Sequence, residues 1–272
     1  MRRDDLSSPR FLTTRVWLWV LVIALGGCAT VRPEAASQVT ASKASMPRLA
    51  SKSDPLESFN RQIFSFNEAV DGAVLKPVAR GYRAVVPDVV QTGVNNVFGN
   101  VADAWSAANH LLQGKGRTGL AMTARFVTNT VVGVAGLVDV ATPLGLEREP
   151  EDFGLTLGHW GLPAGPFVML PLLGPSSLRD LAALPLDRQT RLPALVSAGE
   201  KRNALLALEL IQRRADLLDA GGVMGQIALD RYTFVREAYL ARRRSDVYDG
   251  EPPEEPETDG NGTAPSSSPL KK

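Results

Sequence analysis

The chain has 272 residues, of which 44% are hydrophobic and 22% charged, and its 30 Lys and Arg against 29 Asp and Glu leave a net charge of +1. This balance argues against a nucleic-acid partner, because nucleic-acid-binding domains carry a strongly basic face. Cys28 is the only cysteine, so the chain cannot form an internal disulfide or a cysteine-rich metal site.

Residues 1–27 have the pattern of a bacterial lipoprotein signal peptide. A basic stretch precedes an apolar run at 16–25 that is too short to span a bilayer, and small residues follow. Leu-Gly-Gly-Cys at 25–28 resembles a lipobox, in which a signal peptidase cuts before the cysteine and acyl chains are attached to it. We therefore predict lipidation of Cys28, and Ala29 after it favours the outer membrane. The alternatives are an ordinary signal peptide with a chance cysteine, and an uncleaved anchor.

Three regions are expected after the cleavage site. Residues 28–53 are rich in Ala, Ser and Thr without an apolar period, which indicates a lipidated N-terminus followed by a flexible tether. Residues 249–272 are acidic and Pro-rich, so we expect a disordered tail. The domain between them, 54–248, carries 20 Lys and Arg and 20 Asp and Glu, and it is long enough to bury a sizeable core.

The first part of this domain has a strong helix signal. Asp54 is placed to cap a helix, Pro55 suits the first helical position, and Glu57 completes a capping box. Apolar residues then recur every three or four positions through 54–70, which places them on one helical face. The stripe fits either a core helix or a helix in contact with lipid.

Four further stretches have helical periodicity. They cover 87–113, roughly 118–130, 199–218 and 225–244. The run 131–146 is apolar and irregular, and 126–134 is the one place where a strand competes with a helix. We expect an all-α fold without strands.

Residues 154–177, GLTLGHWGLPAGPFVMLPLLGPSS, contain no charged side chain, yet five glycines and four prolines interrupt them. They cannot form one continuous helix, so they cannot span a bilayer in the usual way. They are also too apolar to suit water. Short apolar pieces bent by Gly and Pro suit a curved segment that lies parallel to the membrane plane and contacts acyl chains on one side.

No catalytic or metal-binding pattern accompanies the two histidines, His110 and His159. Residues 114–119 match G-x-G-x-x-G, but a helical pattern rather than a strand precedes them, so a turn between helices is the better interpretation than a dinucleotide site. We expect no enzyme activity, no metal and no cofactor apart from the lipid on Cys28.

Six phrases in chain order resemble the MlaA (VacJ-like) lipoproteins of Gram-negative outer membranes. They are DPLESFNRQIFSFN at 54–67, KPVARGYRAVVP at 76–87, NHLLQGK at 109–115, RFVTNTVVGVAGLVD at 125–139, DFGLTLGHWGLPAGPFVMLPLLGPSSLRD at 152–180 and DRYTFVREAYLARR at 230–243. The six phrases span essentially all of 54–248 and occur alongside the lipobox, and the acidic tail lies outside the resemblance.

The resemblance implies a ring-like arrangement of amphipathic, Gly- and Pro-kinked helices around a central channel, lying in the plane of the inner leaflet of the outer membrane. It also implies association with a trimeric porin. Such a protein removes phospholipid that has strayed into the outer leaflet and passes it to a periplasmic phospholipid carrier, which maintains lipid asymmetry. The alternatives are a structural tether for a porin and, less favoured, a lipid-modifying enzyme.

Candidate site residues follow from this expectation. The polar side chains that interrupt apolar stretches are proposed to line the channel: Asn60, Asn67, Asn96 and Asp139. The asparagines have an alternative role in capping turns or pairing inside the core, and Asp139 in ending a helix. Candidates for the membrane interface are Trp105, Trp160 and Phe167. A basic group near the C-terminal end of the domain fits either lipid phosphates and the carrier or a solvated helix end: Arg236, Arg242, Arg243 and Arg244.

Overall fold

The computed structural model describes residues 54–219 and 230–253, all of which belong to one compact unit, Leu49–Lys272. The signal peptide 1–27, the lipidation site Cys28, the tether 28–53 and all but the first residues of the tail lie outside the described residues. Those parts of the prediction therefore stay predictions.

The described unit is mainly helical, with one small sheet. In chain order its elements are α2 (Glu57–Val70), the π-helical turn η1 (Asp71–Leu75), α3 (Lys76–Val85), α4 (Asp88–Leu112), α5 (Gly116–Val131), the 3₁₀ turn η2 (Thr142–Leu144), α6 (Phe153–His159), β1 (Phe167–Leu170), β2 (Gly174–Ser177), α7 (Leu178–Gln189), the 3₁₀ turn η3 (Leu192–Leu195), α8 (Gly199–Asp216) and α10 (Arg231–Val247).

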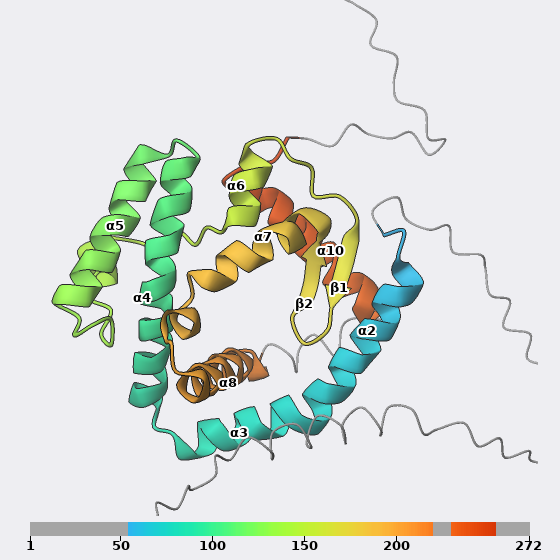
Figure 1. Ribbon diagram of the computed structural model, residues 1–272, viewed down its shortest axis with the longest axis horizontal. Helices are drawn as coiled ribbons and strands as arrows, with labels where there is room; N and C mark the ends of the chain where they lie inside the picture. The colour runs from blue at the N-terminus through green and yellow to red at the C-terminus, as the bar shows by residue number, and fades with distance from the viewer. Residues whose placement is uncertain (1–53, 220–229, 254–272) are drawn as a thin grey trace, which may run out of the picture. The chain divides into compact units, whose positions relative to one another are not determined.

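Helices α2 and α3 are joined without a break through the π-helical turn, and together they form an arc in Figure 1. The backbone N–H of Lys76 donates to the carbonyl of Asp71, five residues back, which is the π-helical pattern. Pro77 follows directly, and a proline ring clashes with the carbonyl four residues before it in a regular α-helix. The wider turn relieves this clash, so the chain bends at η1 instead of ending its helix.

Helices α4 and α5 form an antiparallel pair joined by a short turn at Gly114 and Lys115. Gly114 has φ +78°, a left-handed conformation that glycine adopts at no steric cost. The G-x-G-x-x-G stretch therefore begins in the turn between two helices, as the sequence indicated, and its residues 116–119 form the first turn of α5.

The expectation that the chain contains no strand is wrong for residues 154–177, which glycines and prolines interrupt. Phe167–Leu170 and Gly174–Ser177 pair as an antiparallel hairpin, with Phe167 opposite Ser177 and Leu170 opposite Gly174. Residues Phe167 to Leu170 alternate between buried and half-buried, a period of two that apolar residues on both faces hid in the sequence. Helices α6 and α7 flank the hairpin and were also missed, as was α3.

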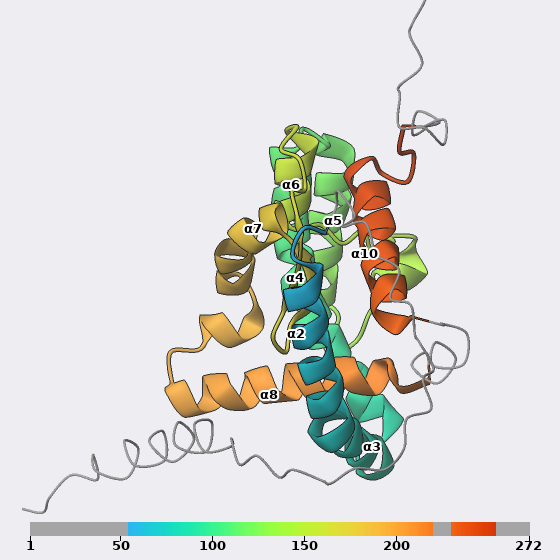
Figure 2. The same ribbon diagram turned by 90° about the vertical axis from the view of Figure 1, so that its right-hand side faces the viewer.

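The elements succeed one another round a ring in Figure 1. Helix α4 stands on one side, α3 and α2 follow, the hairpin and α10 come next, and α6 and α7 lead back to α4. Helix α8 is seen end-on there and lengthwise in Figure 2, where it runs across the direction of α4 and α10. The mainly helical, ring-like arrangement is as expected; a channel through its centre stays a prediction.

Burial in the described residues differs from that in a typical water-soluble domain. The buried set holds more polar and charged residues than hydrophobic ones, and the main buried apolar cluster is small, centred on Phe167, Met169 and Tyr232. Large apolar side chains lie outside instead: Val85 is 81% exposed, Val89 79% and Val131 75%. Such a surface is costly in water and stable against acyl chains. Within the described ranges, no helix is both long and apolar enough to cross a membrane.

Candidate functional site

Asp54 is the centre of a buried hydrogen-bonded group that joins the start of α2 to α10. The amide of Asn60 donates to Asp54 Oδ1 at 2.8 Å, Arg236 Nη1 donates to Asp54 Oδ2 at 3.1 Å, and the hydroxyl of Tyr232 donates to the same oxygen. Asp54 and Asn60 are fully buried. Because buried charges are stable only when paired, this group fixes how α2 and α10 meet.

Two asparagines of α2 hold strand β1 along its length. Asn60 accepts from the N–H of Met169 at 2.9 Å and donates to the carbonyl of Phe167 at 3.0 Å. Asn67 makes the same pair of bonds further along, accepting from Leu172 N–H at 2.8 Å and donating to the Leu170 carbonyl at 2.9 Å. Each side-chain amide therefore replaces a backbone peptide of a neighbouring strand, which satisfies the edge of β1 that β2 does not cover.

The spacing of the two asparagines fits this purpose. Seven helical residues rise about 10.5 Å. The two bonded positions on the strand side are three residues apart, which spans about 10 Å of extended chain. An Asn every two helical turns therefore stays in register with the strand, and the hairpin is fastened from its base to its tip.

A cavity of about 360 Å³ opens beside the hairpin tip, between α2, η1, α8 and α10. Its walls are mostly apolar and include Phe64, Met169 and Leu217, together with Leu172 and Leu173 of the tip. The two tip leucines are each 50% exposed, and Leu172 has φ +63°, an unfavourable conformation for a branched side chain. The bond from its N–H to Asn67 holds it there.

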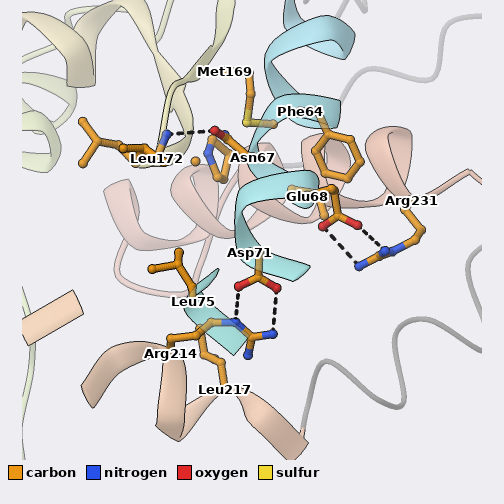
Figure 3. Close-up of a pocket in the computed structure, with 14 residues that line it drawn as sticks. Phe64, Asn67, Glu68, Asp71, Leu75, Met169, Leu172, Arg214, Leu217 and Arg231 are labelled. Atoms are coloured by element: carbon orange, nitrogen blue, oxygen red, sulfur yellow. Dashed lines mark hydrogen bonds and ion pairs between the residues drawn. The ribbon is translucent and has the colours of Figure 1, made fainter. Parts of the chain in front are cut away.

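Two ion pairs stand at this cavity, and Figure 3 shows them side by side. Asp71 receives two bonds from Arg214, one of them from Nη2 to Oδ2 at 2.9 Å. Glu68 receives two bonds from Arg231, the longer from Nη2 to Oε1 at 3.3 Å. The hydrogen bonds that Arg214 donates to Asp71 raise the pKa of the Arg214 guanidinium, which stays charged. The cavity thus combines apolar walls with two positive and two negative groups.

A second buried polar group fixes the loop after α5 and contains Asp139. Arg125 is 1% exposed and donates from Nε to Asp103 at 2.9 Å and from Nη2 to Asp139 at 2.5 Å. Burial by itself would raise the pKa of Asp139, but bonds from Thr142, Arg125 and Asn129 outweigh it and hold that pKa well below its ordinary value. The carboxylate therefore stays ionised and serves as an anchor for Arg125.

Comparison with known proteins identifies the family. A family model described as MlaA lipoprotein matches residues 52–246. The chain belongs to the MlaA lipoprotein family. It is 38% identical over 199 residues to the intermembrane phospholipid transport system lipoprotein MlaA of Escherichia coli K12, with 70% of this chain and 77% of the relative covered.

Two further comparisons agree with this placement. The MlaA of Haemophilus influenzae is 30% identical over 216 residues, which cover 75% of this chain and 82% of the relative. A solved structure from work on the structural basis for maintenance of bacterial outer membrane lipid asymmetry has a TM-score of 0.65 and 37% identity, and 72% of this chain corresponds to 99% of it.

The polar residues predicted to line a channel in this MlaA-family chain take different places. The prediction that Asn60 lines a channel is wrong, because its side chain is fully buried. It pairs with Asp54 inside the core, which is the alternative role given for the asparagines. Asn67 is half-buried and does border a cavity, the one beside the hairpin tip. Asn96 is half-buried and donates to the Leu137 carbonyl at 3.0 Å. Asp139 accepts from Thr142 N–H at the start of η2, the helix-end role. The wall role of Asn67, Asn96 and Asp139 stays a prediction.

The three aromatic candidates for the membrane interface also divide. The prediction that Phe167 lies at the membrane interface is wrong, because its side chain is fully buried and packs edge-on against Tyr232 and Tyr239. Trp160 is 55% exposed, and its indole N–H donates to the Leu112 carbonyl at 3.2 Å. Trp105 is half-buried and donates to Asp187 at 2.8 Å. For both tryptophans a place at headgroup level stays a prediction.

The basic group near the end of α10 is not one surface. Arg236 is 8% exposed and pairs with Asp54, and Arg243 bonds both oxygens of Asp152 at 2.8 and 2.9 Å. Neither arginine is free for lipid phosphates or is a solvated helix end, so both alternatives are wrong for these two. Arg242 has a side chain that is 78% exposed, as a solvated helix end requires.

Sequence reasoning missed the groups that organise the site. Asp54 was expected to cap α2, but its carboxylate is buried and accepts a hydrogen bond from Asn60, six residues later. The N-cap position belongs to Leu56, which makes no capping hydrogen bond with its side chain. Arg125 and the pair Asp71–Arg214 gave no sequence signal, since their partners lie beyond the three- or four-residue spacing of helical neighbours. The seven-residue spacing of Asn60 and Asn67 was visible in the sequence, but its partner strand was not.

Proposed function

We propose that the chain is an outer-membrane lipoprotein that removes mislocalised phospholipid from the outer leaflet and passes it to a periplasmic carrier, which returns it towards the inner membrane and maintains lipid asymmetry. Membership of the MlaA lipoprotein family supports this, as do the relatives named for an intermembrane phospholipid transport system. The solved neighbour concerned with outer membrane lipid asymmetry supports it as well.

The observation that carries the proposal is the distribution of polarity. Large apolar side chains such as Val89, Val131 and Leu120 are exposed, while arginines, aspartates and asparagines are among the buried residues. A body of this kind is stable within one leaflet without a spanning helix. It places polar groups where a headgroup would otherwise have to cross hydrocarbon.

The physical reason for such a protein is the cost of moving a phospholipid through water. Two chains of about 16 carbons, at about 0.8 kcal/mol per CH₂, resist transfer by roughly 25 kcal/mol. A route in which the headgroup moves past polar groups while the tails stay in apolar surroundings removes most of this barrier. No bond of the lipid needs to break, so the proposal requires no catalytic residue.

The family resemblance also underlies the proposed partners. We place the unit beside a trimeric porin in the outer membrane, with the lipidated Cys28 on the periplasmic face and the 28–53 tether leading to the helical unit. The exposed apolar side chains supply surface for both lipid and a membrane-embedded protein.

A strain lacking the chain tests the function. We expect more phospholipid in the outer leaflet, measured in whole cells by its accessibility to an added phospholipase, and greater sensitivity to detergent. Restoring the wild-type chain should return both to normal. Unchanged outer-leaflet phospholipid in the deletion would contradict the proposal and favour a structural porin tether. Fatty acid or lysolipid released by the purified chain from labelled phospholipid would instead indicate an enzyme.

The anchor is tested separately with Cys28→Ala. We expect the variant to remain uncleaved or to leave the outer-membrane fraction, because the acyl chains contribute most of the membrane affinity of the N-terminus. Membrane fractionation and mass spectrometry of the N-terminus measure both. Mature, outer-membrane Cys28→Ala protein would overturn the lipobox assignment.

A further inference from the structure

The cavity beside the hairpin tip has the composition of a site for one amphipathic molecule. Its volume of about 360 Å³ lies within the usual range for small-molecule sites, about 300–1,000 Å³. The apolar wall comes from Phe64 of α2, from Met169 and Leu172 of the hairpin, and from Leu217 at the end of α8, three parts of the chain that are far apart in sequence. A wall of this kind suits an acyl chain.

The charged groups of the cavity come in a particular arrangement. Glu68 and Asp71 are three residues apart, so they are neighbours on one face of the α2–η1 helix. Arg231 reaches Glu68 from α10, and Arg214 reaches Asp71 from α8. Figure 3 shows both carboxylates pointing towards their arginines. The charged residues that line the cavity are thus two arginines and two carboxylates, with no net charge between them.

A π-helical turn places Asp71 in this arrangement. Such turns are frequent at functional sites, because they reorient side chains relative to a regular helix. Here the turn starts at Asp71 and is followed by Pro77, so the local sequence specifies it independently of the charges around the cavity.

The two arginines have donors beyond those that hold the carboxylates. A guanidinium carries five N–H donors, and the bonds to Asp71 use two of those on Arg214. The bonds to Glu68 use donors on two nitrogens of Arg231. A phosphate can therefore bind at the arginines, for which it is a preferred partner, while a cationic group of the same molecule binds at the carboxylates.

We propose that this cavity is a binding site for one zwitterionic phospholipid, with part of an acyl chain against the apolar wall, the phosphate at Arg214 and Arg231, and the headgroup ammonium at Glu68 and Asp71. A phospholipid with a net negative charge satisfies only the arginines and leaves its phosphate facing two carboxylates. The site therefore prefers phosphatidylethanolamine to phosphatidylglycerol. The inference rests on the proposed function and adds a headgroup preference to it.

Native mass spectrometry of the full lipidated protein, released from a detergent micelle, tests this preference. The probes are dioctanoyl phosphatidylethanolamine and dioctanoyl phosphatidylglycerol at equal concentrations in one sample. We expect the wild type to retain the zwitterionic lipid about three- to fivefold more than the anionic one, the scale set by partly exposed ion pairs. Glycerophosphoethanolamine, which has no acyl chains, should not be retained.

The double substitution E68Q and D71N removes both negative charges and keeps both arginines. We expect it to reverse the preference in favour of phosphatidylglycerol. Asp219→Asn is the matched control, because its carboxylate pairs with Arg83 in an exposed ion pair that does not border this cavity; it should keep the wild-type ratio. The ratio is measured within one sample, so partial unfolding lowers retention of both lipids without reversing it.

The outcomes separate this inference from the proposed function. Equal retention of the two lipids by the wild type, or an unchanged ratio in the double variant, overturns the headgroup preference and leaves the transport proposal standing. Retention of glycerophosphoethanolamine as strong as that of the lipid overturns the acyl part of the site. No retention of either lipid counts against both proposals.

Discussion

Asn67 shows how one side chain positions a strand that is distant in the sequence. Its amide makes two bonds to the hairpin tip and holds Leu172 in its left-handed conformation. When the amide is removed, the Leu170 carbonyl and the Leu172 N–H both lose their hydrogen-bond partner. The loss should therefore destabilise the hairpin tip rather than helix α2.

We predict that Asn67→Ala lowers the free energy of unfolding by about 1–3 kcal/mol. Amide hydrogen exchange at residues 170–174 should accelerate, while exchange in α5 stays unchanged. Asn95→Ala is the matched control, since its one bond is an exposed contact of 3.4 Å to Asp216. Equal protection of the tip in wild type and Asn67→Ala would show that the hairpin does not depend on the amide.

Asp139 allows a test by pH. Its pKa is depressed in the folded state, so its stabilising effect is fully present above the ordinary value of 3.8 and is lost as pH falls from there towards the folded pKa. We predict that Asp139→Asn lowers the free energy of unfolding by about 1.5–3 kcal/mol at pH 7. The difference from wild type should shrink below about pH 4.

Unfolding midpoints of both proteins at pH 7 and pH 3 measure this. A difference that is the same at both values would mean that the charge of Asp139 is not what holds Arg125. A difference that grows at pH 3 would give the opposite sign and contradict the assignment.

The elements differ in how far the sequence predicts them. Helix α4 is long and periodic, and its predicted range, 87–113, agrees with Asp88–Leu112. The hairpin was missed because Phe167–Leu170 is apolar on both faces, so no alternation of apolar and polar residues marks it. Helix α7 was missed because Pro185 lies inside it, and proline in a helix interior is a strong contrary signal.

The roles of several side chains could not be predicted from the sequence, because their hydrogen-bond partners lie far away along the chain. The apolar stripe of α2 was visible, but the roles of Asn60 and Asn67 depend on a strand more than 100 residues away. The same holds for Arg236, whose bond to Asp54 spans 182 residues and removes it from the surface. The charge of Arg236 predicted an exposed side chain, but its ion pair with the buried Asp54 keeps it inside the protein.

The turn after α5 provides a test at the scale of an element. A Cβ on Gly133 would lie 2.1 Å from the Val138 carbonyl oxygen and 2.5 Å from that of Asn129, both backbone atoms. Gly133→Ala therefore forces the backbone apart, and we predict a loss of about 1–3 kcal/mol with displacement of the segment that carries Asp139.

Gly72→Ala in η1 is the matched control, because nothing lies within 4 Å of its added Cβ. It should change the free energy of unfolding by less than about 1 kcal/mol. Urea unfolding of both variants gives the comparison, and similar values for the two would show that the turn after α5 adapts to a side chain.

At the scale of the whole described unit, the central claim is that its apolar outside lies in hydrocarbon. The claim explains why large apolar side chains are exposed on α4 and α5 while aspartates and arginines are buried. It also explains how a helical unit can reside in a membrane when no described helix can cross one.

Spin-label accessibility of the lipidated protein in phospholipid nanodiscs tests this claim most directly. Labels are attached one at a time to cysteines replacing Val89, Leu120 and Val131, and to a control cysteine replacing the exposed Arg242. The only native thiol, Cys28, is taken up by the proposed lipid anchor. We predict that oxygen relaxes the three apolar sites strongly and a water-soluble nickel complex does so weakly, with the reverse at position 242. Strong nickel access at all four positions would place the apolar surface in water and contradict the account.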